Sequence, residues 1–169
     1  DAGHLRPIFL KIAPDLDDQG LIDAIDTAQS AELSGMIISN TTIARPSTLT
    51  HPYKAQAGGL SGQPLLVPSS IMLAKAAAHL NASSSLSNFP LIAAGGVSSA
   101  HTAYLKILLG ASLVQVYTAL AIHGPDLPKT IISGLDQLLA QDGYDHVDDA
   151  RGAIPDIDAA LRHVGIPRV

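Results

Sequence analysis

The 169-residue sequence contains no cysteine and no tryptophan, and only 15% of its residues are charged. The absence of cysteine excludes disulfide bonds, thiolate metal sites, iron–sulfur clusters and a cysteine nucleophile. The formal net charge of −5 argues against a nucleic-acid-binding protein or a general binder of anionic membranes, because both need a basic surface. The sequence also has no apolar run close to the roughly 18–20 residues that span a bilayer.

Several catalytic and metal-binding motifs are missing as well. The sequence contains no G-x-G-x-x-G, no Walker A motif and no G-x-S-x-G. Its seven histidines are scattered, and no two of them have the spacing of H-E-x-x-H. We therefore interpret the histidines as surface or structural residues and predict no metal site.

What the sequence does contain is apolar residues, which make up 47% of the chain. Short apolar segments predict four strands, at residues 7–14, 35–40, 90–94 and 112–120. Helical patterns predict helices at about residues 15–33, 69–80, 99–109 and 125–143. Apolar strands that alternate with helices predict a parallel sheet covered by helices, in a doubly wound fold or a (β/α)₈ barrel. A complete barrel takes typically ~250 residues and eight strands, so four strands would be half of one.

Local signals refine these elements. Ser69 or Ser70 is expected near the N-cap of its helix, and Gly143 is expected to end the helix before it. The polar stretch 41–66, which contains "AGGLSGQP", is long for a connection in a compact domain. Its length indicates a functional loop.

Polar residues or glycines stand at the carboxyl end of every predicted strand. They are Lys11, then Ser39, Asn40 and Thr41, then Gly95 and Gly96, then Tyr117 and Thr118. In α/β folds the carboxyl ends of the strands are where ligands bind. The recurrence on all four strands predicts a ligand site there.

Lys11 lies inside an apolar strand, where a lysine is rarely buried without a partner. One reading is an edge strand whose lysine reaches solvent. The other is a cation directed at a ligand, which could stabilise an anion or form a Schiff base.

The double glycine in "LIAAGGVSSA" (91–100) comes where a buried strand runs into a helix. Glycine lets a ligand approach the backbone closely, and helix N-termini favour anions. Barrels often build a phosphate site from the loops after their last two strands. Gly95 and Gly96, together with Tyr117 and Thr118, are therefore candidates for binding a phosphate.

Five motifs occur in the order "LKIAPDL", "SNTT", "GGLSGQPL", "AAGGVSS" and "GASLVQVYTAL". In this order and spacing they resemble the carboxyl-terminal half of the class 2, quinone-reducing dihydroorotate dehydrogenases. The resemblance implies a (β/α)₈ TIM barrel, of which this chain supplies about the last four βα units. It implies that residues 1–145 form the carboxyl-terminal half of an FMN-binding barrel, and that 146–169 is an acidic tail with short helices.

The resemblance also implies the site. The family oxidises dihydroorotate to orotate with FMN and a quinone, in pyrimidine biosynthesis. Positions that match FMN-binding residues are Lys11, Ser39, Gly62, Gly95, Gly96, Tyr117 and Thr118. Lys11 would stabilise negative charge at the N1 and O2 edge of the flavin, and Asn40 and Thr41 would bind orotate.

Other parts of the family pattern have no counterpart in this chain. The serine base, the first half of the barrel and the amino-terminal membrane-associated segment all lie upstream of the matched region. The chain therefore resembles a fragment that needs the remaining half of the barrel as its partner, and that has no activity alone. Resemblance to eukaryotic members implies the mitochondrial inner membrane, with a bacterial membrane as the alternative.

Two other functions stay open from the residues. One is a phosphate-binding TIM-barrel aldolase or lyase in which Lys11 forms a Schiff base. The other is a non-catalytic half-barrel that serves as a binding or assembly module.

Overall fold

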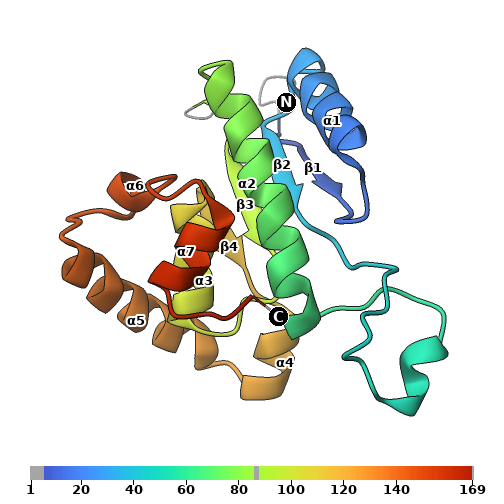
Figure 1. Ribbon diagram of the computed structural model, residues 1–169. Coiled ribbons are helices and arrows are strands. Elements are labelled where there is room, and N and C mark those ends of the chain that lie inside the picture. The colour runs from blue at the N-terminus through green and yellow to red at the C-terminus, as the bar shows by residue number, and fades with distance from the viewer. Residues whose placement is uncertain (1–5, 86–87, 169) are drawn as a thin grey trace.

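The computed structural model describes residues 6–85 and 88–168. At its centre is a four-stranded parallel sheet with strand order β1-β2-β3-β4 (Figure 1). The strands are β1 (Phe9–Ile12), β2 (Gly35–Ile38), β3 (Leu91–Ala94) and β4 (Leu113–Gln115). The predicted α/β fold, with four parallel strands separated by helices, is confirmed.

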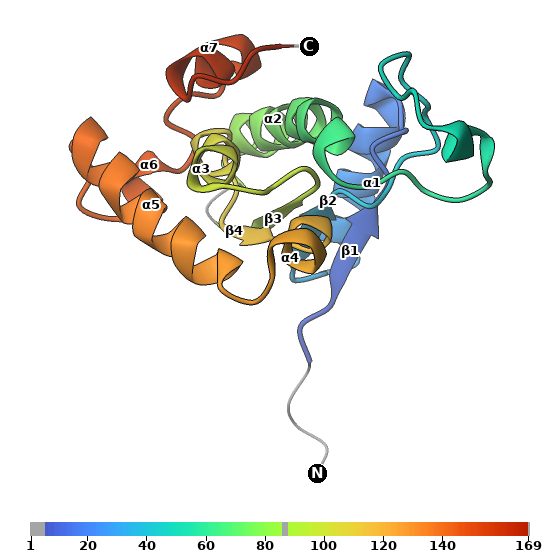
Figure 2. The same cartoon turned by 90° about the horizontal axis from the view of Figure 1, so that it is seen from below.

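A helix follows each strand, and the helices that connect one strand to the next pack on one face of the sheet. The main helices are α1 (Asp18–Ser30), α2 (Leu66–Ala82), α3 (Ala100–Leu108) and α5 (Leu127–Asp142). Shorter helices are α4 (Thr118–His123), α6 (Val147–Ala150) and α7 (Ile157–His163), with 3₁₀ turns at Pro52–Ala55 and Gln63–Leu65. Figure 2 looks toward the carboxyl ends of the strands and shows α2 and α3 along the same side of the sheet.

The strands bury one set of alternating side chains against these helices. Met36 and Ile38 of β2 and Leu91 of β3 are completely buried there, together with Leu73 and Leu80 of α2. Successive side chains of a strand point to opposite faces, so their neighbours lie on the other face of the sheet. The hydrophobic core of this chain therefore lies between the sheet and its helices.

The second face of the sheet is much less covered. Lys11, Ile37, Ile92 and Leu113 are paired in register, so they form one row across that face. Leu113 is 61% exposed, and Ile37 and Ile92 are only partly buried. β1 and β4 are the two end strands of the sheet. This arrangement is what half of a closed barrel would leave open.

The strand predicted at residues 112–120 is too long. β4 ends at Gln115, and α4 already begins at Thr118. The partner of Gln115 is Ala94, the last residue of β3, after which Gly95 and Gly96 turn away with positive φ. Val116 and Tyr117 have β-forming side chains, but no strand is left there for them to pair with.

The cap predicted for the second helix is also wrong. α2 begins at Leu66, directly after the 3₁₀ turn of Gln63–Leu65, and no side chain caps it. Ser69 and Ser70 lie inside the helix and are fully buried. The Ser69 hydroxyl bonds back to the carbonyl of Leu65 at 2.6 Å, as serines inside helices often do.

The last 24 residues, 146–169, contribute α6 and α7, which pack beside α3. Asp142, at the end of α5, accepts hydrogen bonds from Tyr104 of α3 and from His163 of α7, each at 2.6 Å. Although burial raises the pKa of Asp142, these two hydrogen bonds hold it below its usual value. None of the helices in the described part of the chain combines the length and apolar character that crossing a membrane needs.

Candidate functional site

A cavity of about 690 Å³ lies at the carboxyl ends of the four strands. Every residue that the sequence predicts for the site lines this cavity: Lys11, Ser39, Asn40, Thr41, Gly62, Gly95, Gly96, Tyr117 and Thr118. The parallel sheet explains why, because the carboxyl ends of all its strands meet at the same edge. The structure thus brings these residues together, while the role of each stays a prediction.

Lys11 projects from the open face of the sheet and is exposed in the cavity. It belongs to β1, which is an end strand of the sheet, so it also fits the reading of an edge-strand lysine that reaches solvent. Its backbone neighbour Ile12 is buried on the helical face. Because side chains alternate along a strand, Lys11 faces the cavity while Ile12 packs into the core.

The turn after β2 is fixed by its own hydrogen bonds. Ser39 is almost completely buried, and its amide donates to the carbonyl of Ala94 at 3.0 Å. The side-chain oxygen of Asn40 accepts from the amide of Thr41 at 2.9 Å. This bond orients the carboxamide of Asn40 and leaves its NH₂ group as the donor for a ligand.

Gly95 and Gly96 form a tight turn with φ values of 104° and 76°. A Cβ on Gly96 would lie 2.4 Å from Cα of Leu66, and one on Gly95 would lie 2.9 Å from Oγ of Ser69. The start of α2 therefore packs directly against this turn. Sequence reasoning assigned the double glycine to a ligand alone, whereas the structure shows that the packing of α2 requires it as well.

The helix after this turn offers fewer free amides than expected. Ser99 and Thr102 form a capping box, in which each backbone amide donates to the hydroxyl of the other residue. The amide of Ser98 also donates to the hydroxyl of Thr102. By contrast, no side chain caps α4, which begins at Thr118. The amide donors closest to the predicted phosphate position thus come from the glycine turn and from the start of α4.

The long loop between β2 and α2 folds back onto α4. The hydroxyl of Thr118 donates to the hydroxyl of Ser61 at 3.0 Å. A Cβ on Gly62 would lie 3.3 Å from the methyl group of Thr118. The loop and α4 therefore form one wall of the cavity, although they are far apart in the sequence.

Two polar clusters hold this loop. The hydroxyl of Thr42 donates to Asp15 at 2.5 Å, and the main chains of Thr42 and Leu60 pair as an isolated bridge. The guanidinium of Arg45 donates to six carbonyls, those of Thr42, Ile43, Ala44, Lys54, Gln56 and Gly58. Arg45 thereby cross-links the loop internally.

Some lining residues were not predicted. They are Ser61, Gln63, Leu65, Ala94, Val97, Ser98, Gln115, Val116, Ala119, Ile122 and His123. Gln115 could have been found from its place at a strand end. Ser61, Ile122 and His123 reach the cavity only because the loop and α4 fold together, for which the sequence carries no local signal.

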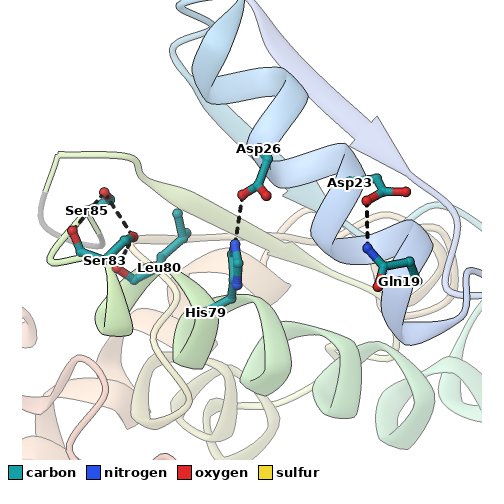
Figure 3. A network of polar contacts seen from close by, with 7 residues as sticks. All are labelled: Gln19, Asp23, Asp26, His79, Leu80, Ser83 and Ser85. Carbon is teal, nitrogen blue, oxygen red and sulfur yellow. Dashed lines mark hydrogen bonds and ion pairs between the residues drawn. The ribbon is translucent and has the colours of Figure 1, made fainter.

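Most of the described histidines lie away from the cavity. His79 of α2 contacts Asp26 of α1 at 2.8 Å (Figure 3). His163 bonds Asp142, and the side chains of His51 and His146 accept backbone amides at the starts of short helices. His123 lines the cavity and is exposed. Within the described residues, no group of three His, Asp or Glu side chains could hold a metal ion.

Comparisons with known proteins agree with this geometry. A family model described as dihydroorotate dehydrogenase matches residues 2–139. Dihydroorotate dehydrogenase (quinone) of Agrobacterium fabrum is 44% identical over 154 residues, which are 91% of this chain and 41% of the relative. The enzyme of the same name from Haloarcula marismortui is 42% identical over 153 residues, covering 90% of this chain and 41% of the relative.

A solved structure is similar in shape. The structure of dihydroorotate dehydrogenase from Eimeria tenella in complex with ferulenol superposes with a TM-score of 0.82 and 37% identity, over 90% of this chain and 39% of that one. Such structures are TIM barrels, so the four βα units described above are about half of such a barrel. The chain spans about two fifths of the length of the relatives that it matches.

Proposed function

The chain belongs to the dihydroorotate dehydrogenase family, and from this premise we propose that it forms the carboxyl-terminal half of a barrel that oxidises dihydroorotate to orotate. The electron acceptor is a quinone, and the reaction is the step of pyrimidine biosynthesis that this family carries out. The observation that carries the proposal is the convergence of all four strand ends, with their predicted residues, on one cavity.

The family is flavin-dependent, and the residues of the cavity suit FMN. The cavity volume of about 690 Å³ falls within the range of small-molecule sites, roughly 300–1,000 Å³. Lys11 comes from the first strand of the sheet, and Thr118 follows the last. The cavity therefore extends across the sheet, with an ammonium at one side and hydroxyl and amide donors at the other. That distribution suits a long ligand with an anionic end.

Each predicted residue then has a defined task. The chemistry that FMN would supply when bound is the acceptance of a hydride and the delivery of electrons to a quinone. Lys11 holds a positive charge where negative charge develops on the pyrimidine edge of the flavin. The backbone amides of Gly95, Gly96, Tyr117 and Thr118 would donate hydrogen bonds to the phosphate.

The remaining cofactor and substrate positions lie nearer to β1 and β2. Ser39 and Gly62, which match flavin-contacting positions of the family, would contact the flavin. Asn40 donates its NH₂ group to a carbonyl or carboxylate oxygen of the pyrimidine substrate, in the orientation that the bond from Thr41 sets. Thr41 offers its hydroxyl beside it.

Proton abstraction from the substrate and closure of the barrel both fall to residues other than these 169. The serine that removes the C5 proton belongs to the amino-terminal half of the family barrel, so we propose that this chain is inactive alone. The same half closes the barrel and carries the membrane-associated segment. The relatives from Agrobacterium fabrum and Haloarcula marismortui are a bacterial and an archaeal protein and give the mitochondrial placement no support, so we propose a bacterial-type membrane association.

The test is to complete the barrel. The chain is fused behind the amino-terminal part of the Agrobacterium fabrum relative, and bound flavin and dihydroorotate-dependent reduction of a quinone analogue are measured. We expect a yellow, active protein from the fusion and neither property from the chain alone. A Lys11→Met variant should keep most of its flavin and lose most of its turnover. A soluble fusion that binds no flavin would contradict the proposal, and borohydride trapping of a carbonyl substrate on Lys11 would favour an aldolase instead.

A further inference from the structure

A lysine outside the cavity is the most unusual charged group of the described chain. Lys106 of α3 is 0% exposed, and within the described residues it forms no ion pair. Its ammonium donates to the hydroxyl of Ser69 at 2.7 Å and to the carbonyl of Leu66 at 3.4 Å. Both acceptors are neutral and belong to the first turn of α2.

Burying an ammonium without a carboxylate is unfavourable, because the group loses its hydration. Burial accordingly lowers the pKa of Lys106 to about 7. A methionine of similar length would fill the same space between α2 and α3 without that cost. Stability alone therefore does not account for a lysine at this position.

The contacts of Lys106 lead to the wall of the cavity. The hydroxyl of Ser69, which accepts from Lys106, has three carbonyl oxygens within reach, those of Leu65 at 2.6 Å, Gly95 at 3.2 Å and Leu66 at 3.3 Å. Leu65 and Gly95 both line the cavity. Ser69 thus joins the ammonium of α3 and the start of α2 to the glycine turn.

The turn has little freedom to move without this contact changing. A Cβ on Gly95 would lie 2.9 Å from Oγ of Ser69, which shows how closely the turn rests on that hydroxyl. The carbonyl of Gly95 faces Ser69, on the side of the turn where Lys106 lies. The turn is therefore held from behind by the hydroxyl of Ser69, which in turn accepts from Lys106.

We propose that Lys106 and Ser69 are positioning residues that hold the Gly95–Gly96 turn in the orientation that binds a phosphate monoester. The inference rests on the proposed function, which places the phosphate of FMN at this turn. We therefore expect the two residues to affect the binding of the phosphate group and not that of the flavin ring. The protonated form of Lys106 also places a positive charge behind the turn, which favours an anion in front of it.

The test compares two ligands that differ only in the phosphate. FMN and riboflavin are titrated into the apo form of the completed fusion protein and of its Lys106→Met and Ser69→Ala variants. We expect the Kd for FMN to rise about tenfold or more, as for loss of a charged hydrogen-bond network, and the Kd for riboflavin to change less than about twofold. Lys129→Met, which removes an exposed lysine of α5, is the matched control and should change neither.

A purely structural role predicts a different pattern. It would weaken FMN and riboflavin binding by the same factor, and that outcome would overturn the inference. If Lys106→Met does not fold, Ser69→Ala decides, since it removes only the hydroxyl that links the ammonium to Gly95.

A second measurement does not depend on flavin. In the 169-residue chain, ¹⁵N relaxation reports backbone motion at each residue. We expect Gly95 and Gly96 to become more mobile in Ser69→Ala, while Ile92 in β3 stays rigid. A wild-type fusion that binds no flavin would contradict the proposed function. Unchanged motion of the turn in Ser69→Ala would contradict the positioning role of Ser69, whether or not flavin binds.

Discussion

At the scale of single residues, the glycine turn after β3 shows that replacing a glycine of positive φ can cost different amounts of stability at different positions. Gly96 and Gly143 have nearly equal φ values, 76° and 78°. A Cβ on Gly96 would lie 2.4 Å from Cα of Leu66, whereas one on Gly143 would meet nothing within 4 Å. Backbone strain alone therefore predicts similar costs for an alanine at the two positions. The contact with α2 should decide which substitution destabilises the chain more.

We therefore expect Gly96→Ala to lower the free energy of unfolding by about 2–4 kcal/mol, because α2 must shift. Gly143→Ala, the matched control, should cost only about 1 kcal/mol, the strain of a left-handed alanine. Urea unfolding followed by circular dichroism measures both. Equal losses would mean that the packing of α2 against the turn is not tight.

The buried ammonium of Lys106 gives a prediction about pH. Its pKa is about 7 in the folded chain against an ordinary value of 10.5, so the unfolded chain binds the extra proton between these values. Stability must then rise with pH from about 7 to about 10.5 on account of this group, and below pH 7 the full penalty remains.

Lys106→Met removes this contribution. Between pH 6 and pH 9, the unfolding free energy of the wild type should therefore rise relative to that of the Lys106→Met variant. Other titrating groups cancel in the difference. Urea unfolding at the two pH values measures it, and a pH-independent difference would show that Lys106 is hydrated or paired.

At the scale of elements, the long loop before α2 is organised by one side chain. Arg45 donates to the carbonyl of Lys54 at 2.9 Å and to that of Gly58 at 2.7 Å, among six carbonyls in all. A guanidinium presents five N–H donors in a rigid plane, whereas an ammonium has only three donors to offer to these six carbonyls. The far end of the loop reaches the cavity through Ser61.

Arg45→Lys should consequently loosen the loop although the charge is kept. We expect chymotrypsin to cleave the variant after Tyr53, which is 67% exposed, at least about fivefold faster than the wild type. Arg162→Lys on α7 is the control with the same change of side chain. Equal cleavage rates in all three proteins would contradict a holding role for Arg45.

The elements also show how far sequence reasoning reaches. The first three strands and the end of α5 at Gly143 follow from local patterns, because burial and φ preferences are properties of short segments. The short β4 and the early start of α2 do not, since each depends on a partner: β4 ends where β3 stops pairing, and α2 begins from the turn at Pro64.

The same distinction applies to the site. Lys11 and Asn40 could be placed because strand ends of a parallel sheet must converge. The contact between Ser61 and Thr118, and the path from Lys106 through Ser69 to Gly95, could not. They arise from a loop and from helices that pack only in the folded chain.

At the scale of the whole molecule, the sheet has one covered and one largely open face. Leu113 lies on the open face, 61% exposed, in a row with Ile92 and Ile37. Both end strands also present unpaired backbone groups. An apolar row beside free strand edges favours self-association when the chain is studied alone.

Leu113→Lys should therefore reduce self-association of the isolated chain. A lysine there places a charge on the edge strand and in the apolar row, while the core loses no contact because Leu113 does not pack against the helices. Ile132→Lys, at a residue of α5 that is 67% exposed, is the matched control on the outer surface. Sedimentation velocity over a range of concentrations should show a smaller associated fraction for Leu113→Lys only. If both variants associate like the wild type, the open face is not the surface through which the chains meet.

In the completed barrel, the same Leu113→Lys change should prevent the barrel from closing, because the position then faces the closed interior.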